Sequence, residues 1–229
     1  MGFLKVLFII LIVISCLIGI AYVMMIFLKK TRYKQISGKK LSNYARLHET
    51  ICSELFRKNV FTGYFFPSKK EKNGAITKYS KIDCVVVTRG GIAVITVCDK
   101  QGRIDNSKQD VWVQCHNDNV TEFENPLIKS EGNKKIVYDI LRKEKLRNIP
   151  LYNIAVFVNK NTEFLAETDN VFSIDEIAMV LKQMNHENAL TMFEMFNAVQ
   201  ILNSSKRTAA EVKTYMKKLN GEKTEYIVE

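Results

Sequence analysis

The chain has 229 residues, and its 34 lysines and arginines exceed its 24 aspartates and glutamates, for a formal net charge of +10. This length allows one sizeable domain with an appendage. None of the five cysteines stands in a C-x-x-C pair, which argues against both a zinc site and a disulfide framework.

The first predicted element is a membrane span. Residues 6–28 carry no charged side chain and are bracketed by Lys5 and Lys29. A helix of this length crosses a hydrocarbon core of about 30 Å. More cations follow the run than precede it, so the positive-inside rule places residues 29–229 in the cytoplasm. We therefore expect a single-pass membrane protein whose C-terminal domain is cytoplasmic.

Residues 29–40 are predicted to form a basic juxtamembrane linker. Its lysines and arginine suit anionic cytoplasmic lipids, so membrane lipids are expected partners of residues 6–40. Because this linker contributes to the net charge, that charge alone does not indicate nucleic-acid binding. A folded domain is expected over residues 41–203, followed by a C-terminal helix and tail over 204–229.

The elements of the domain follow from hydrophobic periodicity and from turn residues. We predict a helix over 41–58, a strand over 60–66 that Pro67 ends, a strand that ends at Thr88, strands over 92–98 and 111–115, a helix over 125–147 and a strand over 151–158. The last strand is apolar on both faces, so it should be central in its sheet.

The last third is predicted to be helical. Capping boxes of Ser173 with Glu176 and of Thr208 with Glu211 precede two apolar stretches, and Gly221 is suited to end the final helix. With the short strand over 111–115 left aside, the resulting order is α-β-β-β-α-β plus C-terminal helices. This order predicts an α/β or α+β domain with a mixed sheet.

Several short motifs occur in a fixed order along the domain: Ile82-Asp83 at the head of a valine-rich strand, Gly91 to Ile95, Gly102, Trp112-x-Gln114, and Asn125-Pro126-Leu127. This ordered set resembles the nuclease-related domain (NERD) family, itself similar to restriction-endonuclease-like enzymes. The resemblance covers about residues 45–160. It implies a restriction-endonuclease-like mixed sheet, a nuclease-related domain over 41–203, and the N-terminal membrane tether that family members often have.

The resemblance also implies a catalytic site. Family members are thought to use a glutamate on the first helix, an aspartate, and a Glu-x-Lys motif on the following strand. Glu49 and Asp83 are the retained candidates here, with Asp83 as the metal ligand, whereas Thr96 and Cys98 occupy the expected Glu and Lys places. Lys129 stands where the family usually has a glutamine.

These departures predict a degenerate site. Residues i and i+2 of a strand share a face, so Thr96 and Cys98 should point toward Asp83. Mg²⁺ prefers carboxylate oxygens, and Thr96 offers only a neutral hydroxyl. Cys98 supplies no fixed cation, and losing such a stabiliser typically costs about 3 kcal/mol of transition-state stabilisation. We expect little or no cleavage and no bound cofactor.

Other functions stay open from the sequence. A rearranged site of Glu49, Asp83 and Asp99 would make the protein an active Mg²⁺-dependent nuclease, and a membrane scaffold for another protein is a further alternative. The cations of the helix over 125–147 form either a solvated face or a track for a DNA or RNA backbone. The candidates for nucleic-acid contact are Lys129, Lys134, Lys135 and Arg142.

Overall fold

The computed structural model describes residues 42–70, 76–117 and 119–220. The predicted membrane span over 6–28 and the linker over 29–40 lie outside these residues. Among the described residues, no helix combines the length and apolar character needed to cross a membrane. The described residues from Asn43 onward belong to one compact unit.

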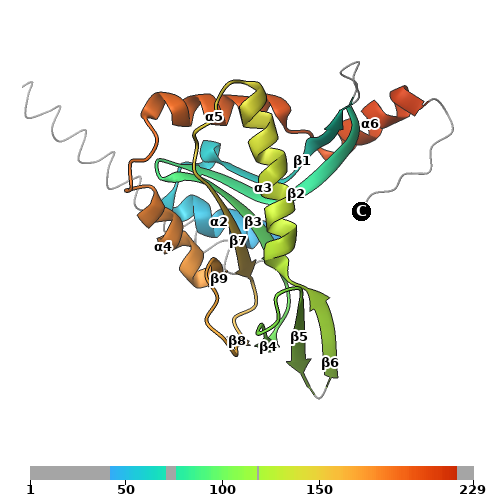
Figure 1. Cartoon of the computed structure of the whole chain (residues 1–229), viewed down its shortest axis with the longest axis vertical. Coiled ribbons are helices and arrows are strands. Elements are labelled where there is room, and N and C mark those ends of the chain that lie inside the picture. Colours follow the sequence, from blue (N-terminus) through green and yellow to red (C-terminus); the bar gives the residue numbers. More distant parts are fainter. Residues whose placement is uncertain (1–41, 71–75, 118, 221–229) are drawn as a thin grey trace, which may run out of the picture. The chain divides into compact units, whose positions relative to one another are not determined.

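The centre of this unit is a five-stranded mixed sheet (Figure 1). Its first three strands form an antiparallel meander, and the other two run parallel to the third. In spatial order the strands are β1 (Val60–Lys70), β2 (Ile76–Thr88), β3 (Gly91–Cys98), β7 (Leu151–Phe157) and β9 (Val171–Ser173).

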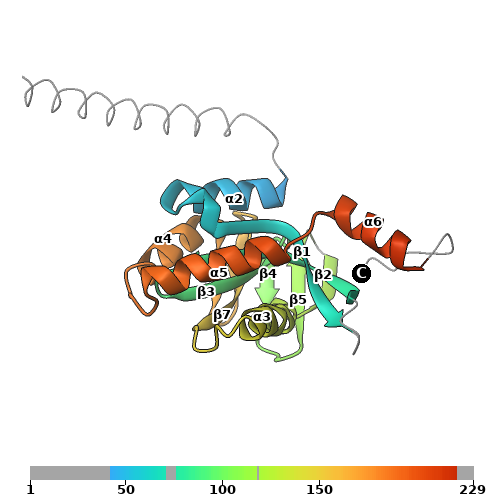
Figure 2. The ribbon, with the colours of Figure 1, turned by 90° about the horizontal axis from the view of Figure 1, so that it is seen from above.

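Helices cover both faces of this sheet (Figures 1 and 2). α3 (Pro126–Lys143) and α5 (Met192–Ser205) pack on one face, against a core that includes Val85, Val87 and Val94. α2 (Asn43–Glu54) and α4 (Ile174–Met184) pack on the other, against Cys84, Val86 and Ile95. Because both faces are buried there, β3 and the second half of β2, residues 82–87, are almost continuously apolar, and the polar Asp83 and Thr96 within them are conspicuous.

A second, four-stranded sheet lies at one end of the first (Figure 1). Its core joins Trp112, Ile104, Phe157 and Cys98. Gly102 opens one of its strands with a φ of +80°, and a Cβ there would lie 2.5 Å from the Cys115 carbonyl oxygen, so only glycine fits. In spatial order the strands are β6 (Asn119–Glu124), β5 (Val111–His116), β4 (Gly102–Asp105) and β8 (Thr162–Phe164).

A 3₁₀ turn, η1 (Arg57–Asn59), and a last helix, α6 (Ala209–Asn220), complete the described elements. The segment between α5 and α6 pairs with the outer edge of β1. The Phe65 N–H donates to the Arg207 carbonyl at 2.9 Å, and the Arg207 N–H donates to the Phe65 carbonyl at 2.8 Å. After α5 the chain thus returns to the sheet and pairs with its edge strand, β1.

Most predicted elements of the sheet are confirmed. β2, β3, β5 and the central position of β7 agree with the expectation. The prediction that Pro67 ends the first strand was wrong, because β1 continues to Lys70. β1 is an edge strand with register shifts after Pro67, and a proline without an N–H is tolerated there.

The helices differ from the expectation mainly at their ends. α2 ends at Glu54 and α3 at Lys143, each earlier than predicted. Both predicted capping boxes are present: Glu176 accepts the Ser173 N–H at 2.8 Å, and Glu211 accepts the Thr208 N–H at 2.6 Å. The predicted domain boundary at residue 203 falls inside α5, and Gly221 lies outside the described residues.

Candidate functional site

Asp83 is a buried carboxylate in the central sheet, with 2% of its surface exposed. The register pairs of β2 with β3 extend from Thr88–Gly91 to Cys84–Ile95. Just beyond the last pair, the Val97 N–H donates to Asp83 Oδ2 at 3.1 Å. The Asp83 side chain therefore lies between the two strands, where it can be reached from both faces of the sheet.

Three donors from three different elements surround this carboxylate. The Tyr44 hydroxyl of α2 donates to Oδ1 at 3.0 Å, and the Lys129 Nζ of α3 lies 3.5 Å from Oδ2, beside the Val97 N–H. A buried carboxylate is costly unless it is paired and hydrogen-bonded, and these groups meet that requirement. Both oxygens of Asp83 are consequently engaged.

The start of α3 is held in a way that brings Lys129 to this position. The Asn125 side chain caps the helix by accepting the Leu127 N–H at 2.9 Å, and Pro126 occupies the first turn. The buried Ser130 hydroxyl donates to the Val94 carbonyl at 2.8 Å and accepts the Ile154 N–H at 3.2 Å. The Asn125-Pro126-Leu127 motif therefore fixes the start of α3, and with it the position of Lys129.

Tyr44 is a site residue that the sequence did not single out. Its place in the apolar stripe of the first helix is typical of a core residue, and no motif marks it. Burial raises the pKa of Tyr44 to about 12, with further contributions from the charge and the hydrogen bond of Asp83. The phenol therefore stays a hydrogen-bond donor at neutral pH. The Lys81 ammonium lies 4.6 Å from the centre of its ring.

Thr96 and Cys98, in the expected Glu and Lys places, are both buried. The Thr96 hydroxyl has no hydrogen-bond partner in the described part of the chain. Burial raises the pKa of the Cys98 thiol to about 12, and the negative charge of Asp83 adds to this effect while Lys129 opposes it. Cys98 is therefore a neutral thiol close to Asp83, and a poor nucleophile at neutral pH.

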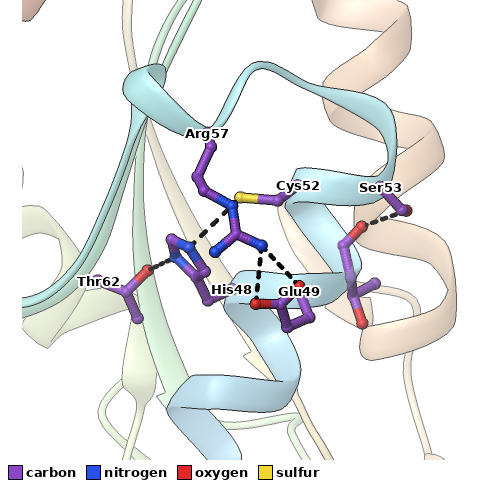
Figure 3. Close-up of polar contacts among 7 residues, drawn as sticks. His48, Glu49, Cys52, Ser53, Arg57 and Thr62 are labelled. Atoms are coloured by element: carbon purple, nitrogen blue, oxygen red, sulfur yellow. Dashed lines mark hydrogen bonds and ion pairs between the residues drawn. The ribbon is translucent and has the colours of Figure 1, made fainter. Parts of the chain in front are cut away.

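Glu49 lies in a different cluster (Figure 3). Its two oxygens accept from one Arg57 nitrogen at 3.0 and 2.9 Å. Beside this pair, the His48 ring contacts Thr62 Oγ1 at 3.0 Å and Cys52 Sγ at 3.5 Å. Within the described residues, Glu49 makes no polar contact with Asp83. The structure therefore does not bring the two retained candidates together, and a catalytic role of Glu49 stays a prediction.

The side chains around Asp83 do not fit a Mg²⁺ ion in this arrangement. Among the described residues, no group of three or more His, Cys, Asp or Glu side chains is placed to hold a metal. The oxygens of Asp83 face N–H and O–H donors, and the nearest buried position on β3 offers the neutral hydroxyl of Thr96. Mg²⁺ sites are instead built from carboxylates and phosphates.

Cations gather around the carboxylate. Lys129 has 51% of its side chain exposed, so its ammonium faces both Asp83 and solvent. Lys81 covers Tyr44, and Lys100, whose charge lowers the pKa of Cys98, lies 5.1 Å from the centre of the Phe123 ring. Such ammonium groups suit a phosphate oxygen.

The other cations predicted to contact nucleic acid lie further along α3. Lys134 forms an ion pair with Glu131 at 2.6 Å. Lys135 and Arg142 are exposed on a helix that also exposes Asp139. Of the four predicted residues, only Lys129 contacts Asp83, and the mixed charges of the remaining surface make it a less suitable phosphate track.

The domain is thus a mixed α/β unit that holds a buried aspartate on β2 beside Lys129 of α3. The family model described as "Nuclease-related domain" matches residues 39–158, about half of the chain, and the chain belongs to this family. This match confirms the resemblance inferred from the motifs. Neither the curated proteins nor the solved structures contain a match to this chain.

Proposed function

We propose that this protein is a catalytically degenerate nuclease-related module that binds the phosphodiester backbone of nucleic acid at the Asp83 site. One observation carries the proposal. Asp83 is a single carboxylate whose oxygens are engaged by Tyr44, Val97 and Lys129. The motifs imply a restriction-endonuclease-like ancestry, and this ancestry would account for a buried aspartate at this position of the sheet.

The loss of cleavage follows from the neighbouring groups. Thr96 replaces a carboxylate with a buried neutral hydroxyl, and Cys98 replaces an ammonium with a thiol whose pKa is raised to about 12. Neither group brings a negative charge to a divalent cation, and neither brings a positive charge to neutralise the charge that develops on a phosphate. Removing one such electrostatic stabiliser costs about 3 kcal/mol, or more than a hundredfold in rate.

Binding without cleavage follows from the charge of the site. Around Cys98 the charges of Lys129 and Lys100 balance those of Asp83 and Asp99. Lys81 adds a further ammonium beside Tyr44, which donates to Asp83. A phosphate group would be attracted there whatever the base sequence. The affinity is then sequence-independent and falls steeply as salt is added.

The test compares binding with cleavage. Fluorescence anisotropy of labelled DNA and RNA oligonucleotides, without metal, should give a dissociation constant that rises with salt. Lys129→Gln should lower the slope of that dependence by about one. Lys182→Gln is the matched control, because Lys182 lies on α4 and pairs with Glu54. Absence of binding at low salt would discard the nucleic-acid role, and a stoichiometric protein partner in its place would favour a scaffold.

The degeneracy has its own test. The wild-type protein should not cut DNA or RNA with Mn²⁺, whereas Thr96→Glu/Cys98→Lys should regain cleavage if the rest of the scaffold is intact. Nicking by the wild type that disappears in Asp83→Ala would contradict the proposal.

One observation favours a second candidate, an active nuclease with a rearranged site. The Lys129 ammonium lies 3.5 Å from Asp83 Oδ2 and carries the charge that Cys98 lacks. In such an enzyme, Lys129 would hold the scissile phosphate from α3 rather than from β3. Metal-dependent nicking by the wild type that is lost in Lys129→Met, but kept in Lys135→Met, would establish this candidate.

The same proposal includes a membrane anchor over residues 6–28, with the domain on the cytoplasmic side. It is supported by the uncharged run and by the cations that follow it. The full-length protein should stay in the membrane fraction after alkaline carbonate washing. Protease added to sealed inside-out vesicles should digest the domain. Resistance in those vesicles and digestion in intact cells would reverse the orientation.

A further inference from the structure

A cavity of about 400 Å³ lies between β1, the segment around η1, and α5. Its lining does not include Asp83, Tyr44, Lys129 or the other residues around Asp83, but it does include His48 and Arg57 of the Glu49 cluster. Phe61, Met195 and Val199 form an apolar interior, and Met192 and Phe196 of α5, which are 61% and 53% exposed, lie at its mouth. This volume and this apolar lining are typical of a small-molecule site.

The charged groups of the cavity are all cations. Arg57, Lys58 and Lys206 line it, and no carboxylate does. Arg57 is neutralised by Glu49 at 2.9 Å (Figure 3). Lys206 forms no ion pair among the described residues, although its charge helps to lower the pKa of the exposed Glu211. Its ammonium lies 4.4 Å from the centre of the Tyr64 ring and 5.2 Å from that of Phe61. The cavity therefore combines an apolar interior with two lysines, Lys58 and Lys206, that form no ion pair among the described residues.

Besides Tyr64, the uncharged polar side chains that line the cavity are His48, Gln200 and Asn203. Both ring nitrogens of His48 are engaged, one by Thr62 and the other by Cys52 (Figure 3). Lys206 lies over the faces of both the Tyr64 and the Phe61 rings, so neither ring offers that face for base stacking. Charge complementarity and apolar contact are what this cavity offers a ligand.

We propose that the cavity binds a single-chain anionic amphiphile, such as a long-chain fatty acid. Its hydrocarbon chain lies against Phe61, Met195 and Val199, and its anionic head lies against Lys206 and Lys58. The apolar interior removes the chain from water, and the unpaired ammonium of Lys206 supplies the countercharge. This inference does not depend on nucleic-acid binding at Asp83.

The test uses the full-length chain in a phosphatidylcholine nanodisc and a long-chain fatty acid that carries a photoreactive diazirine. Mass spectrometry should locate the crosslinks in the peptides of β1 and α5. Lys206→Gln should lower the labelling about tenfold, the effect of losing one charged partner. Lys182→Gln, on the opposite face, should label like the wild type. Equal labelling of all three proteins would overturn the proposal.

Two further probes separate the alternatives. A fatty alcohol with the same diazirine chain lacks the negative charge and should label the cavity weakly; labelling equal to that of the acid would overturn the proposal. An anionic phospholipid with the same diazirine chain, placed in the nanodisc, should not label these peptides. If it does so more strongly than the free acid, the surface docks on a membrane, and the proposal is wrong.

A cavity variant tests the location without disturbing the core. Gln200 lines the cavity but is exposed, so Gln200→Trp should narrow the entrance and leave the thermal midpoint unchanged. This variant should lose labelling by the fatty acid. Undiminished labelling in a folded Gln200→Trp protein would place the ligand elsewhere and overturn the assignment.

Discussion

Lys129 Nζ lies 3.5 Å from Asp83 Oδ2, although 46 positions separate the two residues in the chain. The contact exists because α3 begins directly over β3, where Ser130 is hydrogen-bonded to Val94 and Ile154. The cation thus comes from a helix, whereas the sequence motif places it on the strand.

Removing this ammonium should destabilise the protein only modestly. Lys129→Met leaves Asp83 with the Tyr44 and Val97 donors, and half of the lysine side chain is solvated. We expect a loss of about 1 kcal/mol in the free energy of unfolding, measured in urea. Lys135→Met, on the exposed side of α3, should change it by less. A larger loss for Lys135→Met would contradict the assigned pairing.

Ser130→Ala should be more damaging than its size suggests. The substitution removes a buried hydroxyl that bonds two backbone groups, on β3 and on β7. Leaving buried partners unsatisfied costs about 1–3 kcal/mol. Chemical denaturation should show this loss, and nucleic-acid affinity should fall because Lys129 is no longer held in place. Unchanged stability would mean that α3 is positioned by other contacts.

Tyr44 predicts a dependence of stability on alkaline pH. Its pKa is raised from 10.0 to about 12 in the folded protein, so the folded state favours the neutral phenol. The corresponding stabilisation is complete below pH 10 and is lost as the pH rises through 12. Thermal midpoints of the wild type should therefore fall more steeply over this range than those of Tyr44→Phe.

An exposed tyrosine provides the control for that measurement. Tyr138 lies on the outer side of α3, and Tyr138→Phe should follow the wild-type curve. Ultraviolet absorbance of the phenolate should show one late-ionising tyrosine fewer in Tyr44→Phe. Curves of the same slope for all three proteins would show that Tyr44 does not donate to a charged Asp83.

Thr96→Val should leave the protein as stable as before or more stable. The Thr96 hydroxyl is buried without a partner in the described residues, and valine has nearly the same shape. Replacing an unsatisfied hydroxyl by a methyl group gains up to about 1 kcal/mol. Urea denaturation measures the change. A clear destabilisation would indicate that the hydroxyl bonds a group, such as a buried water, that supports Asp83.

The cysteines should differ in their reactivity toward iodoacetamide. Burial raises the pKa of Cys98 and of Cys84 to about 12, so neither supplies thiolate at neutral pH. Cys115 is exposed on β5. Peptide mass spectrometry after brief alkylation at pH 7.5 should find Cys115 modified and Cys98 intact. Rapid modification of Cys98 would contradict its burial beside Asp83.

The central sheet was predictable because its strands have a simple signature. β3, β7 and the second half of β2 are largely apolar on both faces and are followed or preceded by turn residues, so the composition of each segment predicts its burial. β4, β6, β8 and β9 were missed, since they are short, and β6 is mostly exposed. An edge strand with no apolar face has no such signature.

The proximity of Cys98 to Asp83 was predictable, because a strand fixes the direction of its side chains. The site was not predictable where two helices converge. Tyr44 reaches Asp83 from the start of α2, whereas Glu49, on the same helix, turns toward Arg57. The rotation of a helix about its axis depends on packing against the whole sheet, and the sequence does not encode it in any short motif.

The return of the chain to β1 also bears on self-association. An unpaired outer strand is a template on which a second molecule can extend the sheet. By exchanging both backbone hydrogen bonds with Phe65, Arg207 occupies part of that template. A protein shortened before Arg207 would present these amides to its neighbours, so the segment after α5 helps to keep concentrated copies from stacking edge to edge.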